Sequence, residues 1–336
     1  MNSGRKEPPS IWWWAFGYFA TYVPYAAMTK AITSEPPMVT TGNGAVGGLE
    51  LLPPSVMATV LTSITFLIAT GWWRYAGRRT IAGVSIPFPD RLTFLSGLCS
   101  AGIIGTTTLA YTYKEGIVVA QLFLRGGVLM LAPIVDTITR RKVKWNSWLG
   151  LALSLGGVLL PFVVDPSFSI SQGLGIDVAI YLFCYFVRLQ LMSRRAKSSA
   201  PDANMRYFAE EQLVSSPALL VGLVIAWIAG HAEIGAGFTS FFDRPVWLVG
   251  IAIGIMSQGT GIFGGLILLD KRENTFCVPV NRASSMLAGV VGSVALVAIF
   301  GAKMPRWPEL VAAGLIIGAI AALAVPPILA KRRARA

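Results

Sequence analysis

Three arginines stand inside long apolar runs of this sequence, where an ionisable side chain is costly. Arg125 follows QLFL, Arg188 follows YFV, and Arg282 follows VPVN. A guanidinium group can bind a carboxylate or a phosphate through two parallel N–H donors. Arg125 and Arg282 are therefore candidates for binding an anionic group, and the alternative is a structural role in which they bond to carbonyls or to a neighbouring helix. Arg188 lies near the end of its run and is expected to extend toward the membrane surface.

Further polar and aromatic side chains in these runs are suited to holding an organic molecule. Ligand pockets typically have an apolar and aromatic wall with a few placed polar groups. The candidates are Tyr22, Tyr25, Thr107, Tyr111, Gln121, Tyr181, Tyr185, Gln258 and Asn281. The alternative for each is hydrogen bonding between helices, which Tyr and Thr also provide.

Catalytic and metal-binding patterns are missing from the sequence. The single histidine, His231, stands in a predicted loop, and there is no HExxH motif, nucleophile elbow or phosphate-binding loop. We expect no enzyme activity, no metal and no cofactor. The one acidic residue considered for proton coupling is Asp136, and Arg140 four residues later favours a local salt bridge instead. No carboxylate is predicted near the membrane midplane, so exchange and facilitated diffusion remain open.

The composition requires a membrane as solvent. Of the 336 residues, 54% are hydrophobic and 13% charged, and the mean hydropathy is +0.63. A formal net charge of +12 would suit nucleic acid only if the basic residues formed one face of a soluble domain. They stand between the apolar runs instead, so we expect a lipid-bilayer partner and no nucleic acid.

Ten runs are long enough to cross the membrane as helices, which takes roughly 20 apolar residues each. The sequence therefore predicts an all-α, polytopic membrane protein. The predicted spans are residues 11–31, 53–73, 92–112, 116–138, 146–164, 173–192, 211–230, 246–269, 276–300 and 308–330.

Basic residues alternate between the loops in a way that predicts orientation. Most of the 28 lysines and arginines fall at the N-terminus, in every second loop and at the C-terminus, while the other loops are mostly acidic. Lys and Arg accumulate on the cytoplasmic side of a membrane. We expect a multi-pass protein of the inner, cytoplasmic membrane with both termini in the cytoplasm.

An internal repeat relates the two halves. At an offset of 157 residues Gly97 matches Gly254, Gly102 matches Gly259, and Arg125 matches Arg282; Ser100, Leu109 and Lys114 also match Ser257, Leu266 and Lys271. Five spans per unit is an odd number, so the second unit must enter the membrane in the opposite orientation. The sequence predicts two inverted five-helix units, residues 1–165 and 166–336, with a cavity between them near the midplane.

The predicted fourth and fifth spans carry a family resemblance. They read LFLRGGVLMLAPIVDTITRRKVKWNSWLGLALSLGGVLLP, and NRASSMLAGVVGSVALVAIFGAKMPRWPELVAAGLIIGAIAAL repeats this more loosely in the second half. This pattern resembles the drug/metabolite transporter superfamily, specifically its EamA-type members. The resemblance implies two five-helix inverted repeats and export or exchange of amino acids, nucleosides, drugs, sugars or related metabolites.

The function expected from these features is transport of a small organic solute by alternating access. The alternative is a lipid or lipid-precursor flippase or scramblase of the same superfamily, because Arg125 and Arg282 would also suit a lipid phosphate. A channel would need rings of charge or carbonyls, which the sequence does not show. The expected partners are a small-molecule substrate and the bilayer, and a homodimer is compatible with the sequence.

Overall fold

The chain is folded almost entirely into helices, as an all-α membrane protein requires. The computed structural model describes residues 11–81, 83–131, 145–165, 169–196, 202–269 and 274–333. The long helices are α1 (Ile11–Thr33), α2 (Gly48–Thr70), α3 (Arg91–Ala110), α6 (Trp145–Val164), α7 (Gln172–Arg195), α8 (Ala203–Ile228), α10 (Trp247–Leu269), α11 (Asn274–Phe300) and α12 (Trp307–Arg333). Between α3 and α6 lies the helix Ile117–Leu131, made of α4 (Ile117–Gln121), the π-helical turn η2 (Leu122–Gly126) and residues 127–131.

Several of these helices meet the requirements for crossing a membrane. Among the described residues, six are long and apolar enough: Gly48–Thr70, Arg91–Ala110, Gln172–Met192, Ala203–Ile228, Trp247–Leu269 and Val280–Phe300. Three shorter apolar helices are Ile117–Leu131, Trp148–Val164 and Trp307–Ala322. Because the main-chain groups of a helix are bonded within it, such segments are stable in hydrocarbon. The protein is therefore a membrane protein with multiple spanning helices.

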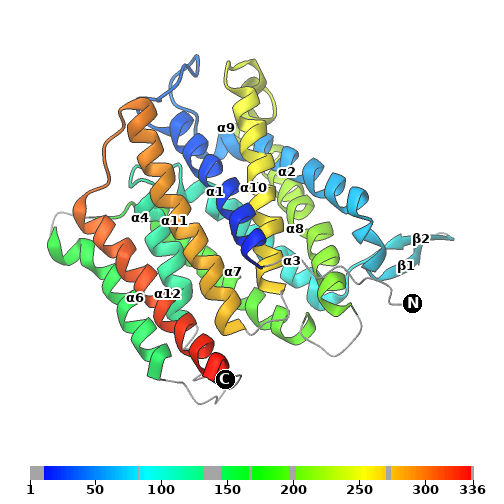
Figure 1. The fold of residues 1–336 in the computed structure, drawn as a ribbon. Coiled ribbons are helices and arrows are strands. Elements are labelled where there is room, and N and C mark those ends of the chain that lie inside the picture. The colour runs from blue at the N-terminus through cyan, green and yellow to red at the C-terminus, as the bar shows by residue number, and fades with distance from the viewer. Residues whose placement is uncertain are drawn as a thin grey trace.

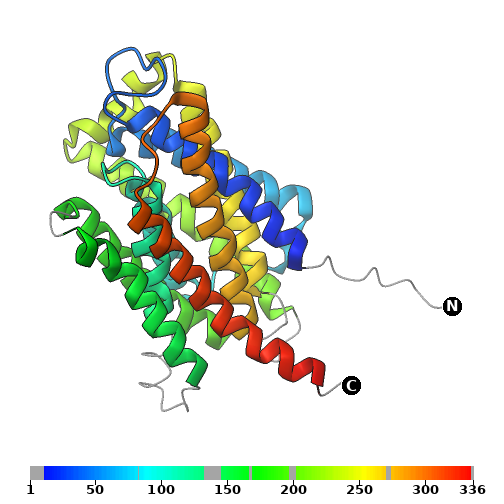
Figure 2. The ribbon, with the colours of Figure 1, turned by 60° about the vertical axis from the view of Figure 1, so that its left-hand side comes forward.

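The helices form one bundle with a separate pair at one edge (Figure 1). Helix α1 packs against α10 and α11, while α3 packs between α7 and α8. Helix α2 packs against α10 and α8. Helices α6 and α12 pack against each other, and both views show them running side by side at the edge of the bundle (Figures 1 and 2).

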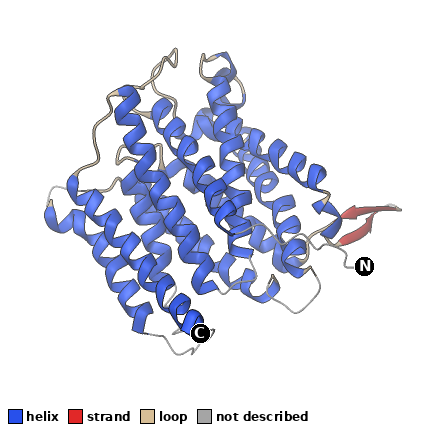
Figure 3. Ribbon diagram, in the orientation of Figure 1, coloured by secondary structure: helices blue, strands red, loops and turns tan. Residues whose placement is uncertain are grey.

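The connections contain elements that the sequence did not predict. A hairpin of β1 (Arg78–Ile81) and β2 (Val84–Pro87) joins α2 to α3 and projects from the bundle (Figure 3). The short helix η1 (Trp72–Tyr75) precedes it, and α9 (Ala232–Phe238) and η3 (Ser240–Asp243) lie between α8 and α10. Helix α2 stops where Gly71 adopts a left-handed conformation with φ of 70°, which favours glycine.

Helix α8 begins at Ala203, well before the predicted span of residues 211–230, so that boundary was wrong. The apolar criterion excluded the first two turns because they carry Arg206, Glu210 and other polar residues. Arg206 and Glu210 form an ion pair of 2.7 Å, which makes the charges compatible with a helix. As a result, Glu211 lies inside a helix of the bundle instead of at a loop boundary.

Candidate functional site

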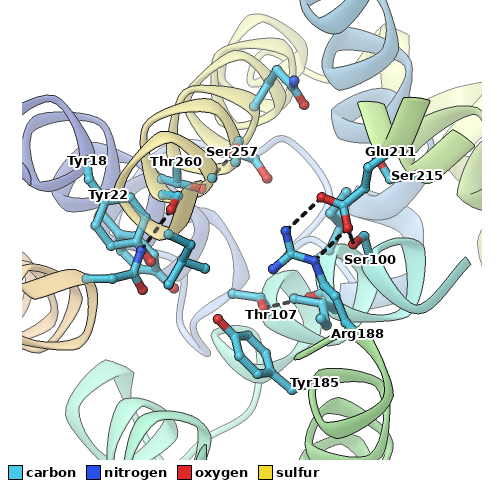
Figure 4. Close-up of a pocket in the computed structure, with 18 of the residues that line it drawn as sticks. Tyr18, Tyr22, Ser100, Thr107, Tyr185, Arg188, Glu211, Ser215, Ser257 and Thr260 are labelled. Atoms are coloured by element: carbon cyan, nitrogen blue, oxygen red, sulfur yellow. Dashed lines mark hydrogen bonds and ion pairs between the residues drawn. The ribbon is translucent and has the colours of Figure 1, made fainter. Parts of the chain in front are cut away.

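A cavity lies in the middle of the bundle, walled by α1, α3, η2, α7, α8, α10 and α11 (Figure 4). The empty space between its side chains measures about 760 Å³, including its mouth. Polar and aromatic groups dominate the wall. They are Tyr18, Tyr22, Tyr25, Ser100, Thr107, Arg125, Tyr185, Arg188, Glu211, Gln212, Ser215, Ser257, Gln258, Thr260, Asn281 and Arg282.

Arg282 lines this cavity and carries hydrogen-bond donors without a partner among the described residues. Only 1% of the residue is exposed, and its guanidinium group lies over the Tyr185 ring, 4.3 Å from the ring centroid. Its Nη1 donates to the Tyr181 hydroxyl at 3.5 Å. The Nε and Nη2 groups are buried and have no hydrogen-bond partner in the described chain, and no carboxylate there pairs with Arg282. A buried cation with two unpaired donors is a strong attractor for an anion.

Arg125, in contrast, is fully bonded. Its Nε donates to Gln121 Oε1 at 3.0 Å, its Nη1 to the Tyr181 hydroxyl and its Nη2 to the Tyr22 hydroxyl. The guanidinium carbon lies 5.3 Å from the Tyr22 ring centroid and 5.6 Å from that of Tyr181. These contacts join the helix Ile117–Leu131 to α1 and α7. These bonds are typical of an arginine with a structural role, although Arg125 also lines part of the cavity.

A tyrosine cluster closes the bundle beside Arg125. The Tyr22 and Tyr111 hydroxyls lie 2.6 Å apart, Gln121 Nε2 donates to the Tyr111 hydroxyl, and the Tyr25 hydroxyl lies 2.9 Å from Thr108 Oγ1. Tyr22, Tyr25 and Tyr111 are each at most 1% exposed. This cluster, defined by these three tyrosines, is therefore a buried and hydrogen-bonded part of the bundle that joins α1 to Tyr111 at the end of α3.

Opposite Tyr18 and Tyr22, the cavity wall holds an ion pair (Figure 4). Arg188 Nε lies 2.7 Å from Glu211 Oε1, and Arg188 Nη2 lies 2.8 Å from Glu211 Oε2. The expectation that Arg188 extends to the membrane surface was wrong: its side chain is 12% exposed and bound in this two-pronged contact. Two carboxylates are buried in the described part of the bundle: Glu211 is 2% exposed, and Asp177 on α7 is 4% exposed.

The site residues predicted from the sequence divide into two groups. Tyr25, Arg125, Tyr185, Gln258, Asn281 and Arg282 line the cavity. Tyr111 and Gln121 do not line it and act behind the wall, through the tyrosine cluster and Arg125. Gln258 Nε2 donates to Gln212 Oε1 at 2.8 Å and Asn281 Nδ2 to the Gly264 carbonyl at 3.3 Å, so both amides are partly engaged in holding helices together.

Sequence reasoning missed Glu211 and Tyr18 in the cavity wall, and a further signal would have found Tyr18. Tyr18 and Tyr22 on α1 match Tyr181 and Tyr185 on α7 at an offset of 163 residues. Each pair is spaced by four, so each stands on one helix face. The salt bridge expected between Asp136 and Arg140 lies outside the described residues.

The cavity lies nearer to the helix ends that carry the basic loops. Arg188 stands seven residues before the end of α7 at Arg195, and Glu211 stands eight residues after the start of α8 at Ala203. Leu268, also in the wall, adjoins the end of α10. Tyr22 and Tyr25 of the tyrosine cluster also line the cavity, whereas Tyr111 lies behind its wall. The space is thus asymmetric along the bundle axis.

No metal centre stands out in the described parts of the chain, where no group of three or more His, Cys, Asp or Glu is placed to hold an ion. Cys99 and Cys184 are free thiols there. The ligand chemistry of the cavity is therefore that of guanidinium, hydroxyl and amide groups.

Comparisons with known proteins give little to add. No family model matches the chain, and no curated protein matches it. Among solved structures 27 chains match. One, described only as "Crystal structure of protein", is 14% identical with a TM-score of 0.49 over 96% of this chain and 98% of that one. What this protein does has to be inferred from its own residues.

Proposed function

We propose that this protein is a secondary transporter that moves a small organic metabolite bearing an anionic group across the cytoplasmic membrane by alternating access. The observation that carries the proposal is Arg282. Arg282 lines the central cavity, and its buried Nε and Nη2 groups have no partner among the described residues. The rest of the wall carries Arg125, the Arg188–Glu211 pair and many tyrosine, hydroxyl and amide groups. A buried cation without a partner costs free energy that a bound anion would recover. The aromatic wall suits an organic body attached to that anionic group.

Matching contacts in the two halves support the inverted-repeat architecture that alternating access uses. Any side chain at Gly102 would meet Cys184 on α7, and any side chain at its match Gly259 would meet Thr21 on α1. The packing of α3 on α7 thus has a counterpart in that of α10 on α1.

A second pair of glycines follows the same rule. A side chain at Gly97 would meet Val214 on α8, and one at Gly254 would meet Ser55 on α2. In both cases the glycine of the first half contacts a helix of the second half, and its match contacts a helix of the first half in return. We therefore infer that residues 1–165 and 166–336 are related units. We further propose ten spans, both termini in the cytoplasm and the architecture of EamA-type drug/metabolite transporters, which the sequence resembles. The end of the bundle that carries the basic loops is then the cytoplasmic side. The present cavity is then inward-facing, with the tyrosine cluster as the closed outer gate.

The test is a thermal-shift screen of the detergent-solubilised protein against benzoate, phenyl phosphate, glutamate, uridine, spermidine and phosphatidylglycerol. A ligand that binds only the folded state raises the apparent melting temperature in a saturable way. We expect shifts from the organic anions that Arg282→Met abolishes and that Arg79→Met, on the exposed hairpin, leaves unchanged. A shift from phosphatidylglycerol alone would favour lipid translocation, and shifts from uridine or spermidine that ignore Arg282 would refute an anion site.

A further inference from the structure

The Arg188–Glu211 ion pair is the one charged contact that faces the cavity through a carboxylate, among the described residues. Burying two charges to join helices is expensive, and apolar packing would serve as well for stability alone. A position on the wall of a solute cavity therefore calls for another account.

The surroundings of Glu211 are suited to both protonation states of its carboxyl group. Its Oε1 accepts from the hydroxyls of Ser96 at 3.0 Å, Ser100 at 2.9 Å and Tyr207 at 3.1 Å, in addition to Arg188. A hydroxyl can donate to a carboxylate and can turn to accept from a protonated carboxyl group. Loss of Arg188 from this site would therefore leave Oε1 of a neutral Glu211 bonded to these hydroxyls, while Oε2, whose recorded donor is Arg188, would be open to the cavity side of the pair.

A second Arg–Glu pair shows that this shell is not a general feature. Glu50, at the start of α2, binds Arg244 in the same two-pronged way, at 2.8 and 3.0 Å. Its other recorded donor is the main-chain N–H of Gly47, which cannot accept a proton in return. Glu50 does not line the cavity. The surroundings of Glu50 therefore suit only its charged carboxylate, whereas those of Glu211 suit both the charged and the protonated form.

Other groups near Glu211 do not replace Arg188 as its counter-charge. From α3 it faces Ser96, Ser100 and the thiol of Cys99, and from α7 it faces Arg188, with Cys184 beside Cys99. Tyr207 is on α8 itself. In the described residues of α2, η1 and α9, which also pack on α8, no charged side chain bonds to Glu211; α2 reaches the neighbouring Gln212 through Ser63.

We propose that Glu211 binds a proton when an organic anion occupies the cavity, so that the anion and the proton cross the membrane together; this rests on the proposed transport function. The anion, which meets Arg282 in the same cavity, also competes with Glu211 for the Nε and Nη2 donors of Arg188. Glu211 then takes a proton from the water at the cavity mouth, forming one O–H bond. One negative charge and one proton enter together, so the net charge of the site is unchanged and no carboxylate is left buried without a partner.

The experiment measures proton uptake on addition of benzoate to the purified protein in weakly buffered solution with a pH indicator. About one proton should be bound per benzoate, so that benzoate affinity falls about tenfold for each unit of rising pH. Glu211→Gln should bind benzoate at least as tightly as the wild type, with no proton uptake and no pH dependence, because the competitor for Arg188 is gone. The control Glu50→Gln should keep the wild-type slope.

The outcomes separate the two proposals. Benzoate binding without proton uptake in the wild type, or uptake that persists in Glu211→Gln, overturns the coupling and leaves transport standing. The wild-type measurement decides the question alone if Glu211→Gln does not fold. Failure of benzoate, phenyl phosphate and glutamate all to bind overturns the transport of organic anions and the coupling with it.

Discussion

Arg125 and Arg282 occupy matching positions in the two halves of the sequence but have different environments. All three nitrogens of the Arg125 guanidinium group donate to side chains of the bundle, whereas two of the three in Arg282 have no partner among the described residues. They share only the Tyr181 hydroxyl. The comparison teaches that a repeated residue need not have a repeated role: one arginine holds helices, and the other is available to a ligand.

The neighbours of the two arginines explain the difference. Arg125 is bonded to Gln121 and, through it and Tyr22, to Tyr111. The positions 157 residues beyond Gln121 and Tyr111 are Val278 and Leu268, which offer no hydrogen-bonding side chain. Arg125 also stands on the π-helical turn η2, whereas Arg282 stands on the regular helix α11, and such turns often redirect side chains at functional sites.

The largest effect is expected from removing the bonded arginine. Arg125→Met leaves Gln121, Tyr22 and Tyr181 without their charged partner, and hydrogen bonds to charged groups are worth about 1.5–3 kcal/mol each. We expect a loss of about 2–4 kcal/mol in stability after the relief of burying one charge. Thermal unfolding in detergent measures it. An unchanged melting temperature would remove the structural half of the comparison.

Removing the unpaired arginine should instead affect binding. Arg282→Met is expected to change the stability of the empty protein by less than about 1 kcal/mol, since the loss of one long hydrogen bond and of the contact with the Tyr185 ring is offset by the removal of a buried charge with two unpartnered donors. Affinity for benzoate should fall about 10- to 100-fold, as expected for losing a charge-assisted contact. Calorimetric titration of the two variants side by side checks this. Equal binding losses in both would mean that the two arginines do the same work.

The shared hydroxyl provides the smallest and sharpest test. Tyr181→Phe should cost about 1 kcal/mol in stability, the usual net value of one hydrogen bond. Because most of that bond belongs to Arg125, the substitution should cost little further in an Arg125→Met background and its full amount in an Arg282→Met background. Unfolding midpoints of the two double variants measure the coupling. Full additivity in both backgrounds would show that the hydrogen bonds of the Tyr181 hydroxyl with the two arginines contribute nothing to stability.

A large part of the fold and some of the site could be predicted from the sequence. Helices, their approximate bounds and the burial of Arg125 and Arg282 follow from apolar run length, because hydrocarbon leaves the main chain few alternatives to a helix. The burial of Glu211 could not be predicted, because its partner Arg188 is 23 residues away and on another helix. The earlier start of α8 leaves a signal in the sequence, because Arg206 pairs with Glu210 four residues later.

The sequence by itself determined that this is a helical membrane protein with costly arginines at matching places. Only the tertiary structure decided which arginine is free and which is bonded. The partners of Arg125 include Tyr22, 103 residues away, and Tyr181, 56 residues away; Glu211 is 23 residues from Arg188. Apolar run length reports the transfer of each segment into lipid, whereas hydrogen bonds and ion pairs depend on which faces of distant helices meet.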